Sequence, residues 1–215
     1  GKKSFHSSLV NLTKNEDKVT YALYKSPETR EFVTGKINED KFWLWLKNYL
    51  SLDMSKDQFI NLWTKDYEVD QGIRALVLQV RENGYKTCIC SNNNPLRVDS
   101  LQQKFHFLDD FDVIAFSHKS HFVKPDIDMF RYLLKKAEVK PEELVYSDDN
   151  PERLQGAKEL GIKTFVFENT QQFRNELVGL GVNISDVPTD ANDTAIMAET
   201  EHECLPEEIS KEVED

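Results

Sequence analysis

Short apolar segments alternate with helical patterns through the second half of the chain, and this alternation constrains the fold more than any other feature. A helical pattern through Ile73 and Val80 precedes the first segment and stops at Gly84, a residue type that tolerates a left-handed helix cap. Short apolar strands separated by single helices favour parallel strands joined by right-handed crossovers, so we predict an α/β fold. The expected strands are 87–90, 113–116, 144–146 and 164–167, and the expected helices are 96–105, 127–137, 152–160 and 172–180.

The first 70 residues follow a different pattern, in which no strand is evident. Apolar residues from Phe42 to Leu50 recur at helical spacing after Asn38, a suitable N-cap, and the segment from Phe59 to Trp63 continues the pattern. We therefore expect a small helical domain before the α/β core. The expected divisions are a leading remnant over 1–14, the helical domain over 15–69, the core over 70–184 and an acidic tail over 185–215.

The net charge of the 215-residue chain is −11, and most of it lies at one end. Residues 186–215 contain eleven acids and one lysine, so the rest of the chain is almost neutral. A nearly neutral body gives no reason to expect nucleic acid or an anionic membrane as a partner, and no apolar run is long enough to span a bilayer. We expect the tail to be disordered and to serve either as a tether or as a docking segment for a basic protein partner. Three cysteines without a disulfide or zinc pattern, and the lack of a signal-peptide pattern, predict a soluble cytoplasmic protein.

Ser91 lies where the first expected strand gives way to a helix, at the sheet edge where ligands collect in open parallel sheets. Its hydroxyl and the backbone amides after it, beginning with Asn92, are suited to hold a phosphate oxygen at the positive end of the helix. The same segment has a purely structural interpretation, because Asn94 and Pro95 are typical of a helix start. The two interpretations are compatible.

Lys124 and the pair Asp148 and Asp149 complete the set of candidate residues. A single lysine at a loop end is usually a solvated charge, but a fixed ammonium near a phosphoryl group would neutralise shifting charge. Two adjacent carboxylates at a strand end repel one another, and a cation normally compensates. Mg²⁺ is the obvious candidate because it binds through one or two carboxylates together with water and phosphate. Helix capping by Asp149 or Asn150 is the alternative.

Three segments resemble the second, third and fourth motifs of haloacid dehalogenase-like hydrolases. They are Gly84 to Asn93, Lys124 to Phe130 and Leu144 to Gly161, and they match the family in order, spacing and strand context. The resemblance extends over roughly Glu16 to Leu180. It implies a three-layer Rossmann-like parallel sheet, and it makes the helical domain a cap between the first and second motifs that closes over the site and selects the substrate.

The resemblance also implies roles for individual residues. Ser91, with Asn92, would bind the transferring phosphoryl group, and Lys124 would steady that group and the nucleophile. Asp149, alone or together with Asp148, would hold Mg²⁺. Arg153 falls where some members have a further acid, which puts a second carboxylate contact in doubt.

The family's first motif has no visible counterpart. In this family an Asp at the end of the first strand forms the covalent intermediate, and a second Asp two residues later acts as acid and base. Asp17, the nearest candidate, follows no expected strand. The missing strand lies mid-sheet, so its loss would leave its neighbours about 9–10 Å apart. Three outcomes stay open: Ser4 to Leu12 replaces the strand, the neighbours close up, or the motif lies upstream of Gly1.

These observations lead to a main functional hypothesis and two rivals. The first is a Mg²⁺-dependent phosphatase for a small phosphorylated metabolite, inactive as this chain because the nucleophile is absent. The second is a non-catalytic module that binds a phosphorylated ligand or a protein, and the third is a truncated product without a stable fold. Substrate identity, phosphatase against dehalogenase chemistry, and oligomeric state stay open.

Overall fold

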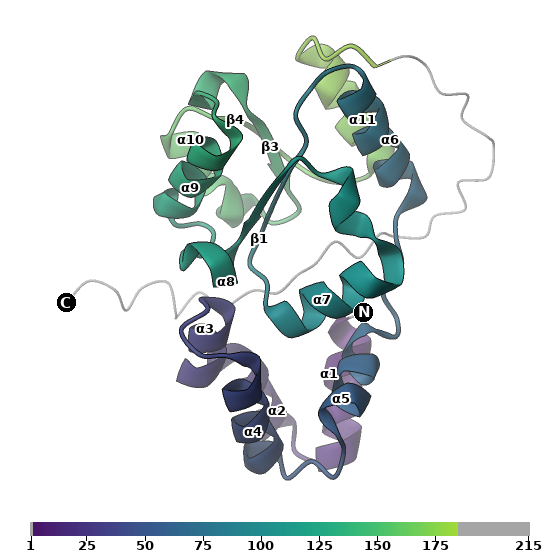
Figure 1. Cartoon of the computed structure of the whole chain (residues 1–215), viewed down its shortest axis with the longest axis vertical. Helices are drawn as coiled ribbons and strands as arrows, with labels where there is room; N and C mark the ends of the chain where they lie inside the picture. Colours follow the sequence, from purple (N-terminus) through teal and green to yellow (C-terminus); the bar gives the residue numbers. More distant parts are fainter. Residues whose placement is uncertain (1, 185–215) are drawn as a thin grey trace.

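A computed structural model describes residues 2–184 and places a helical unit below a sheet-containing part (Figure 1). The predicted acidic tail, residues 185–215, lies outside the described residues. Within residues 2–184 no helix is both long and apolar enough to cross a bilayer.

The helical unit has one hydrophobic core that contains the predicted helical domain and also the segment before it. Phe5 packs between Phe59 and Trp63, with ring centroids 5.5 and 5.1 Å away. The expected remnant over 1–14 is therefore part of this unit, and the segment from Ser4 to Leu12 is helical, not a replacement strand. The elements are α1 (Lys2–Thr13), α2 (Glu16–Thr20), the π-helical turn η1 (Tyr21–Lys25), α3 (Pro27–Val33), α4 (Glu39–Leu50) and α5 (Lys56–Thr64).

Side-chain caps fix where these helices begin. Asn38 accepts a hydrogen bond from the Lys41 amide at 2.9 Å, as the sequence predicted, and Ser55 forms a capping box with Gln58 at the start of α5.

The second part alternates helices and strands in the predicted order. Its first helix ends at Glu82, and Gly84 follows with a positive φ of 85°. Most predicted boundaries lie within two residues of the observed ones. The elements are α6 (Gln71–Glu82), β1 (Cys88–Ser91), α7 (Pro95–Phe105), η2 (Phe107–Asp110), β2 (Val113–Phe116), α8 (Ser117–Ser120), α9 (Ile127–Ala137), η3 (Pro141–Glu143), β3 (Val145–Asp148), η4 (Pro151–Leu154), α10 (Gln155–Glu159), β4 (Lys163–Val166) and α11 (Thr170–Gly179).

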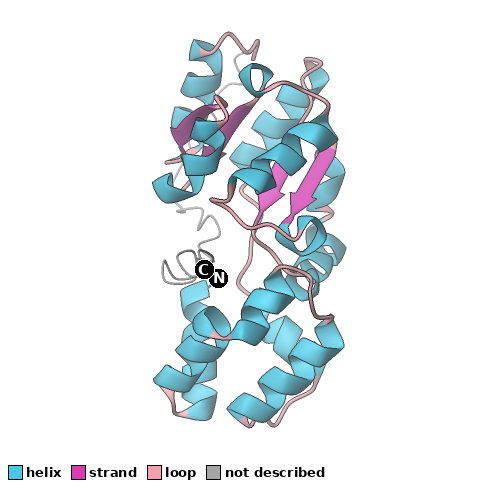
Figure 2. Cartoon of the chain, turned by 90° about the vertical axis from the view of Figure 1, so that its left-hand side faces the viewer, coloured by secondary structure: helices cyan, strands magenta, loops and turns pink. Residues whose placement is uncertain are grey.

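The four strands form two separate parallel pairs, β1 with β2 and β3 with β4 (Figure 2). Within residues 2–184 no strand lies between β1 and β3, and these two strands do not pair with each other. The sheet is therefore interrupted at the position expected for the family's first strand. Of the three outcomes foreseen from the sequence, neither replacement by Ser4 to Leu12 nor closing of the neighbours is observed.

Helices cover both faces of this interrupted sheet, as an α/β fold requires. On one face, α9 and α10 pack against the strands through buried residues such as Met129, Phe130 and Ala157. On the other face, Leu76 of α6 and Leu177 of α11 pack near Val145. All four residues of β1 are only half-buried, although the sequence predicted a buried strand, because one of its edges has no strand neighbour.

Candidate functional site

The loop from Ser91 to Asn94 joins the end of β1 to α7. Asn94 caps the helix by accepting a hydrogen bond from the Arg97 amide at 3.2 Å, so the structural interpretation of this segment is correct. The amide of Asn93 donates to the Ser117 hydroxyl at 2.9 Å, and that of Asn94 donates to the Asn93 side chain at 2.9 Å. These two amides are thus used within the protein. The half-buried Ser91 hydroxyl makes no hydrogen bond to another described residue.

Asn92 is buried, and its side chain holds the Lys124 backbone. Its amide oxygen accepts from the Lys124 N–H at 2.7 Å, and its amide nitrogen donates to the Lys124 carbonyl at 3.0 Å. The predicted ligand contact of Asn92 is therefore limited to its backbone, because its side chain positions Lys124.

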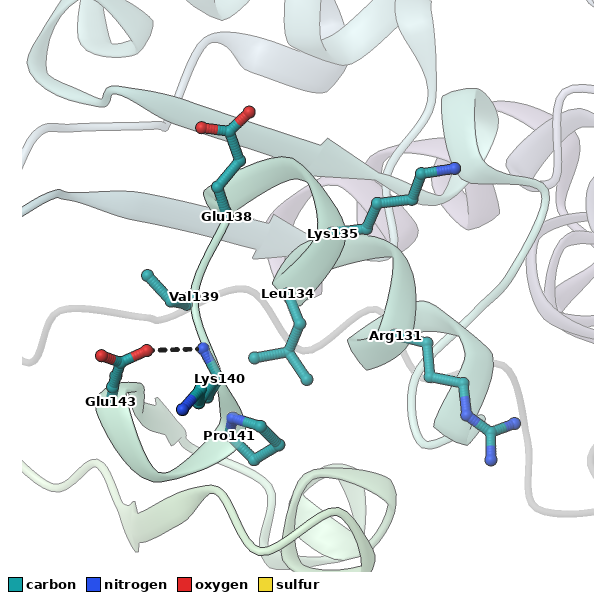
Figure 3. Close-up of a pocket in the computed structure, with 8 residues that line it drawn as sticks. All are labelled: Arg131, Leu134, Lys135, Glu138, Val139, Lys140, Pro141 and Glu143. Carbon is teal, nitrogen blue, oxygen red and sulfur yellow. Dashed lines mark hydrogen bonds between the residues drawn. The ribbon is translucent and has the colours of Figure 1, made fainter.

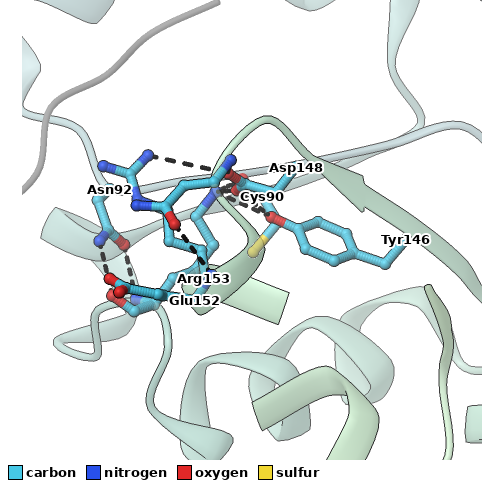
Figure 4. Close-up of polar contacts among 8 residues, drawn as sticks. Cys90, Asn92, Tyr146, Asp148, Glu152 and Arg153 are labelled. Carbon is cyan, nitrogen blue, oxygen red and sulfur yellow. Dashed lines mark hydrogen bonds and ion pairs between the residues drawn. The ribbon is translucent and has the colours of Figure 1, made fainter. Parts of the chain in front are cut away.

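Lys124 lies between the two strand pairs, and only 8% of its surface is exposed to solvent. Its ammonium donates to the Cys90 carbonyl of β1 at 3.0 Å, to the Tyr146 hydroxyl at 2.8 Å and to the Asp148 carboxylate of β3 at 2.5 Å. Figure 4 shows these partners gathered at one place, with Arg153 beside Asp148. An ammonium has three donors, so all three are engaged.

Asp148 is the anion that balances this buried cation. Burial alone would raise its pKa, but the Lys124 ammonium and a hydrogen bond from the Asn150 amide lower the pKa of Asp148 to about 2. The Arg153 guanidinium lies 4.0 Å from the same carboxylate. The Asp148 carboxylate is therefore ionised near neutral pH and is already paired with a cation.

Two further groups in this cluster, the thiol of the half-buried Cys90 and the hydroxyl of the buried Tyr146, are chemically inert near neutral pH. Burial raises the pKa of the Cys90 thiol to about 12 and the pKa of the Tyr146 hydroxyl well above its ordinary value. The thiol is thus not a nucleophile, since thiolates carry that reactivity. The Tyr146 hydroxyl, which also donates to Asp148 at 2.9 Å, orients the ion pair.

Asp149 is the carboxylate of the pair that best suits a metal, because Asp148 is used by Lys124. It is half-buried and directly follows β3, while Asn150 caps η4 through the Glu152 amide at 2.9 Å. Within residues 2–184 no three His, Cys, Asp or Glu side chains form a metal cluster. One carboxylate, a phosphate and water still fit Mg²⁺, which needs few protein ligands. In such a site the bound Mg²⁺ would neutralise phosphate charge.

The helical unit contacts the segment that follows β2, near the carboxyl end of that strand. The Ser117 hydroxyl donates to the Val33 carbonyl at 2.8 Å, and the His121 Nδ1–H donates to the Thr34 carbonyl at 2.7 Å. His118 donates to the Asn93 carbonyl at 2.8 Å, and burial lowers its pKa. These contacts place the helical unit beside the loop that carries Ser91.

A surface groove lies elsewhere, between the end of α9 and η3 (Figure 3). It has a volume of about 630 Å³ and a mixed lining that includes Lys140 and Glu143, whose carboxylate accepts from the Lys140 amide at 2.8 Å. The groove is not part of the candidate site, because η3 lies at the beginning of β3 and Asp148 lies at the end of that strand.

The structure thus brings Lys124 and Asp148 into contact, with Asn92 clamped to Lys124, and places Ser91 and Asp149 at the carboxyl ends of β1 and β3. Sequence reasoning missed Tyr146, because a tyrosine in an apolar strand has the same pattern as a core residue. It also gave no role to Arg153, which the structure places beside Asp148.

The chain is thus an α/β protein in which polar residues lie at the carboxyl ends of parallel strands, beside a buried lysine. Residues 12–167 match the family described as haloacid dehalogenase-like hydrolase, and the chain belongs to this family. The resemblance noted from three motifs is therefore confirmed.

Curated relatives and solved structures agree with this membership. A D-ribitol-5-phosphate phosphatase of Bacteroides thetaiotaomicron is 26% identical over 155 residues, which cover 69% of this chain and 75% of the relative. The murine bifunctional epoxide hydrolase 2 is 31% identical over 104 residues, 46% of this chain and 19% of that protein.

Among solved structures, a HAD-like family hydrolase from Porphyromonas gingivalis superposes with a TM-score of 0.73, 18% identity and coverage of 85% of this chain and 91% of that one. A Bacteroides thetaiotaomicron family enzyme in complex with magnesium and inorganic phosphate gives a TM-score of 0.68, 19% identity and coverage of 78% and 87%. These similarities establish the predicted α/β fold.

Proposed function

We propose that this chain carries a Mg²⁺-dependent phosphate site of the phosphatase type, for a small phosphorylated metabolite. The observation that carries the proposal is the buried Lys124, which lies between β1 and β3 where Ser91 ends β1 and Asp149 follows β3. The D-ribitol-5-phosphate phosphatase relative and the family structure with magnesium and phosphate support the substrate class and the metal.

Ser91 would donate its hydroxyl to a phosphate oxygen, and Asp149 would hold Mg²⁺ against the same phosphate. Lys124 would supply positive charge, either through space or by releasing one of its present partners. The helical unit would close the site and select the substrate, which fits its contacts with α8.

Calorimetric titration with inorganic phosphate tests this site directly. We expect phosphate to bind saturably in the presence of about 5 mM MgCl₂ and much more weakly without it, because Mg²⁺ would be bound by both the phosphate and the Asp149 carboxylate. Ser91→Ala and Asp149→Asn should each weaken binding by about tenfold or more, since each removes a charged or charge-assisted contact. Asp57→Asn, in an exposed position of α5, is the matched control and should bind like the wild type. Equal binding by all four proteins would refute the site.

We further propose that the described residues bind phosphate without hydrolysing it. No described strand ends in a carboxylate other than that of Asp148, and Asp148 is occupied by Lys124. An exposed Asp17 in α2 has no strand before it and is an unsuitable nucleophile. In this form of the proposal the described residues make up a phosphate-ligand binding module, which is one form of the non-catalytic alternative from the sequence.

A hydrolysis assay with p-nitrophenyl phosphate and MgCl₂ distinguishes an active phosphatase from a module that binds phosphate without hydrolysing it. We expect no turnover above background, because positioning and charge stabilisation have no nucleophile to act on. Turnover of about 1 s⁻¹ or faster that Asp149→Asn abolishes would show an active phosphatase and refute the binding-only form.

A further inference from the structure

Three consecutive asparagines follow Ser91, and each is bound to a different part of the protein. The Asn92 side chain holds the backbone of Lys124, and the Asn94 side chain caps α7. Asn93 lies between them, and its partners lead to the helical unit. The position of the Ser91 hydroxyl, at the start of this loop, therefore depends on how the three asparagines are held.

Arg97 holds the side chain of Asn93. Its guanidinium Nε–H donates to the Asn93 amide oxygen at 2.9 Å, and the Asn94 N–H donates to the same oxygen at 2.9 Å. An amide oxygen has two lone pairs, so these two donors determine its orientation. The backbone of Asn93 is held as well, because its N–H donates to the Ser117 hydroxyl at 2.9 Å and its carbonyl accepts from His118 at 2.8 Å.

The same guanidinium contacts the helical unit and the segment that joins it to α6. Its Nη1–H donates to the Tyr67 hydroxyl at 3.4 Å, and its central carbon lies 5.8 Å from the centre of the Trp63 ring in α5. Trp63 stacks on Phe5, 5.1 Å away, in the core of the helical unit. Figure 1 shows α7 where the helical unit meets the sheet-containing part. Arg97 thus joins the loop that begins at Ser91 to the helical unit.

The surroundings of Arg97 are unfavourable for a positive charge. The residue is fully buried, and it is the third residue of α7, within the first turn, where the backbone amides form the positive end of the helix dipole. Removing a charge from water costs free energy, whereas an apolar side chain of similar length would pack at this position without that cost. The role of an arginine here therefore lies in the groups that its guanidinium holds.

We propose that Arg97 is a positioning residue for the phosphate site, which acts through Asn93 and not by contact with phosphate. By fixing Asn93 against the helical unit, Arg97 sets the position of the Ser91 hydroxyl two residues earlier in the loop. The inference rests on the proposed phosphate site. It adds that the helical unit takes part in phosphate binding through this loop, besides closing the site.

Arg97→Met removes the guanidinium and leaves an unbranched side chain in its place. Calorimetry with inorganic phosphate and MgCl₂ should show about tenfold weaker binding, because the loop is no longer held in one position. Arg74→Met is the matched control, since the Arg74 guanidinium pairs with Asp110 at 2.8 Å, before β2 and thus at the opposite end of the sheet. This control should lose stability but bind phosphate like the wild type.

A double-mutant cycle distinguishes positioning of the Ser91 hydroxyl from a general loss of structure. If Arg97 acts through that hydroxyl, Arg97→Met should weaken phosphate binding by less than about twofold in a protein that already carries Ser91→Ala. A further loss of about tenfold in that background would overturn the proposal, because the two side chains would then act independently.

Arg97→Lys separates geometry from charge. A lysine keeps the positive charge, but its ammonium on a flexible stem does not hold Asn93 and Tyr67 in the fixed geometry of the planar guanidinium. Phosphate binding should therefore stay at least about threefold weaker than in the wild type. If Arg97→Lys binds phosphate like the wild type while Arg97→Met does not, charge alone accounts for the effect and the positioning role is wrong. If Arg97→Met does not fold, judged by circular dichroism, Arg97→Lys takes its place in the cycle with Ser91→Ala.

Hydrogen exchange of single amides, measured by NMR without phosphate, tests the positioning separately from the proposed function. Arg97→Met should speed exchange of the Asn93 and Asn94 amides by about tenfold or more and leave the amides of β3 at their wild-type rates. Unchanged exchange at Asn93 and Asn94 in the folded variant would overturn the inference even if the wild type binds phosphate. Faster exchange at these two amides, with no phosphate binding by the wild type, would instead overturn the proposed function and support the role of Arg97 in holding the loop.

Discussion

Lys124 and Asp148 determine the properties of the site at the scale of single residues. Their side chains are 6% and 5% exposed, and they are held at 2.5 Å with Tyr146 as a shared partner. A buried ion pair contributes little net stability over an apolar pair, but the loss of one partner leaves an uncompensated charge. The pair therefore constrains Lys124 to lie between the two strand pairs, which is where a phosphate would meet it.

Asp148→Asn should lower the free energy of unfolding by about 3 kcal/mol, because Lys124 would remain buried without its carboxylate. Asp149→Asn is the matched change one residue away and should cost about 1 kcal/mol or less, since Asp149 is half-buried. Urea denaturation measures both values. Similar losses for the two variants would contradict the separate roles given to the two carboxylates.

Because the pKa of Asp148 is lowered in the folded protein, the stability contributed by the ion pair depends on pH in the acidic range. Its folded-state pKa is about 2, whereas the pKa in an unfolded chain is about 3.9. A lowered pKa in the folded state contributes stability above the unfolded value, and this contribution is lost as the pH falls from about 4 to about 2. We expect a loss of about 2 kcal/mol across this window in the wild type, and a flatter profile in Asp148→Asn. Identical profiles in denaturant titrations at pH 5, 4, 3 and 2 would show that Asp148 does not carry the effect.

At the scale of elements, close approach of α10 to the Lys124 segment positions the lysine. Gly156 in α10 has no side chain, and a Cβ there would lie 2.2 Å from the Pro125 carbonyl oxygen and 3.0 Å from the Ile127 amide nitrogen. Backbone atoms cannot move aside as a flexible side chain can. The glycine therefore allows α10 to pack against the segment that begins α9.

Gly156→Ala should destabilise the protein by about 2 kcal/mol and weaken phosphate binding, because the backbone next to Lys124 must shift. Gly179→Ala, near the end of α11, meets nothing within 4 Å and should be neutral or stabilising by up to about 1 kcal/mol. Thermal unfolding and phosphate calorimetry on the two variants make the comparison. Equal effects would mean that the contact with Pro125 does not position the site.

Elements were more predictable from the sequence than contacts. Strand 113–116 and helix 127–137 matched β2 and α9 because short apolar runs and amphipathic periodicity are local signals. The role of Asn92 was not predictable, since its two bonds to Lys124 join positions 32 residues apart. The role of Tyr146 was hidden for the same reason, because nothing in an apolar strand indicates that its hydroxyl meets an ion pair.

At the scale of the whole molecule, an interrupted sheet and a helical unit surround the candidate site. The first strand of the family had no visible counterpart in the sequence, which left three outcomes open, and within residues 2–184 no strand lies between its expected neighbours β1 and β3. The packing of α1 into the helical unit was not predicted, because the choice between a remnant and a core helix depended on long-range contacts with Phe59 and Trp63. The helical unit and the two strand pairs are thus joined around Lys124 and the loop after β1.

A crystal structure of the chain grown with MgCl₂ and inorganic phosphate tests the central claim most directly. The account predicts phosphate within hydrogen-bonding distance of the Ser91 hydroxyl, with Mg²⁺ between that phosphate and the Asp149 carboxylate. Phosphate bound only in the groove of Figure 3, beside Arg131 and Lys140, or at no ordered position at all, would contradict it.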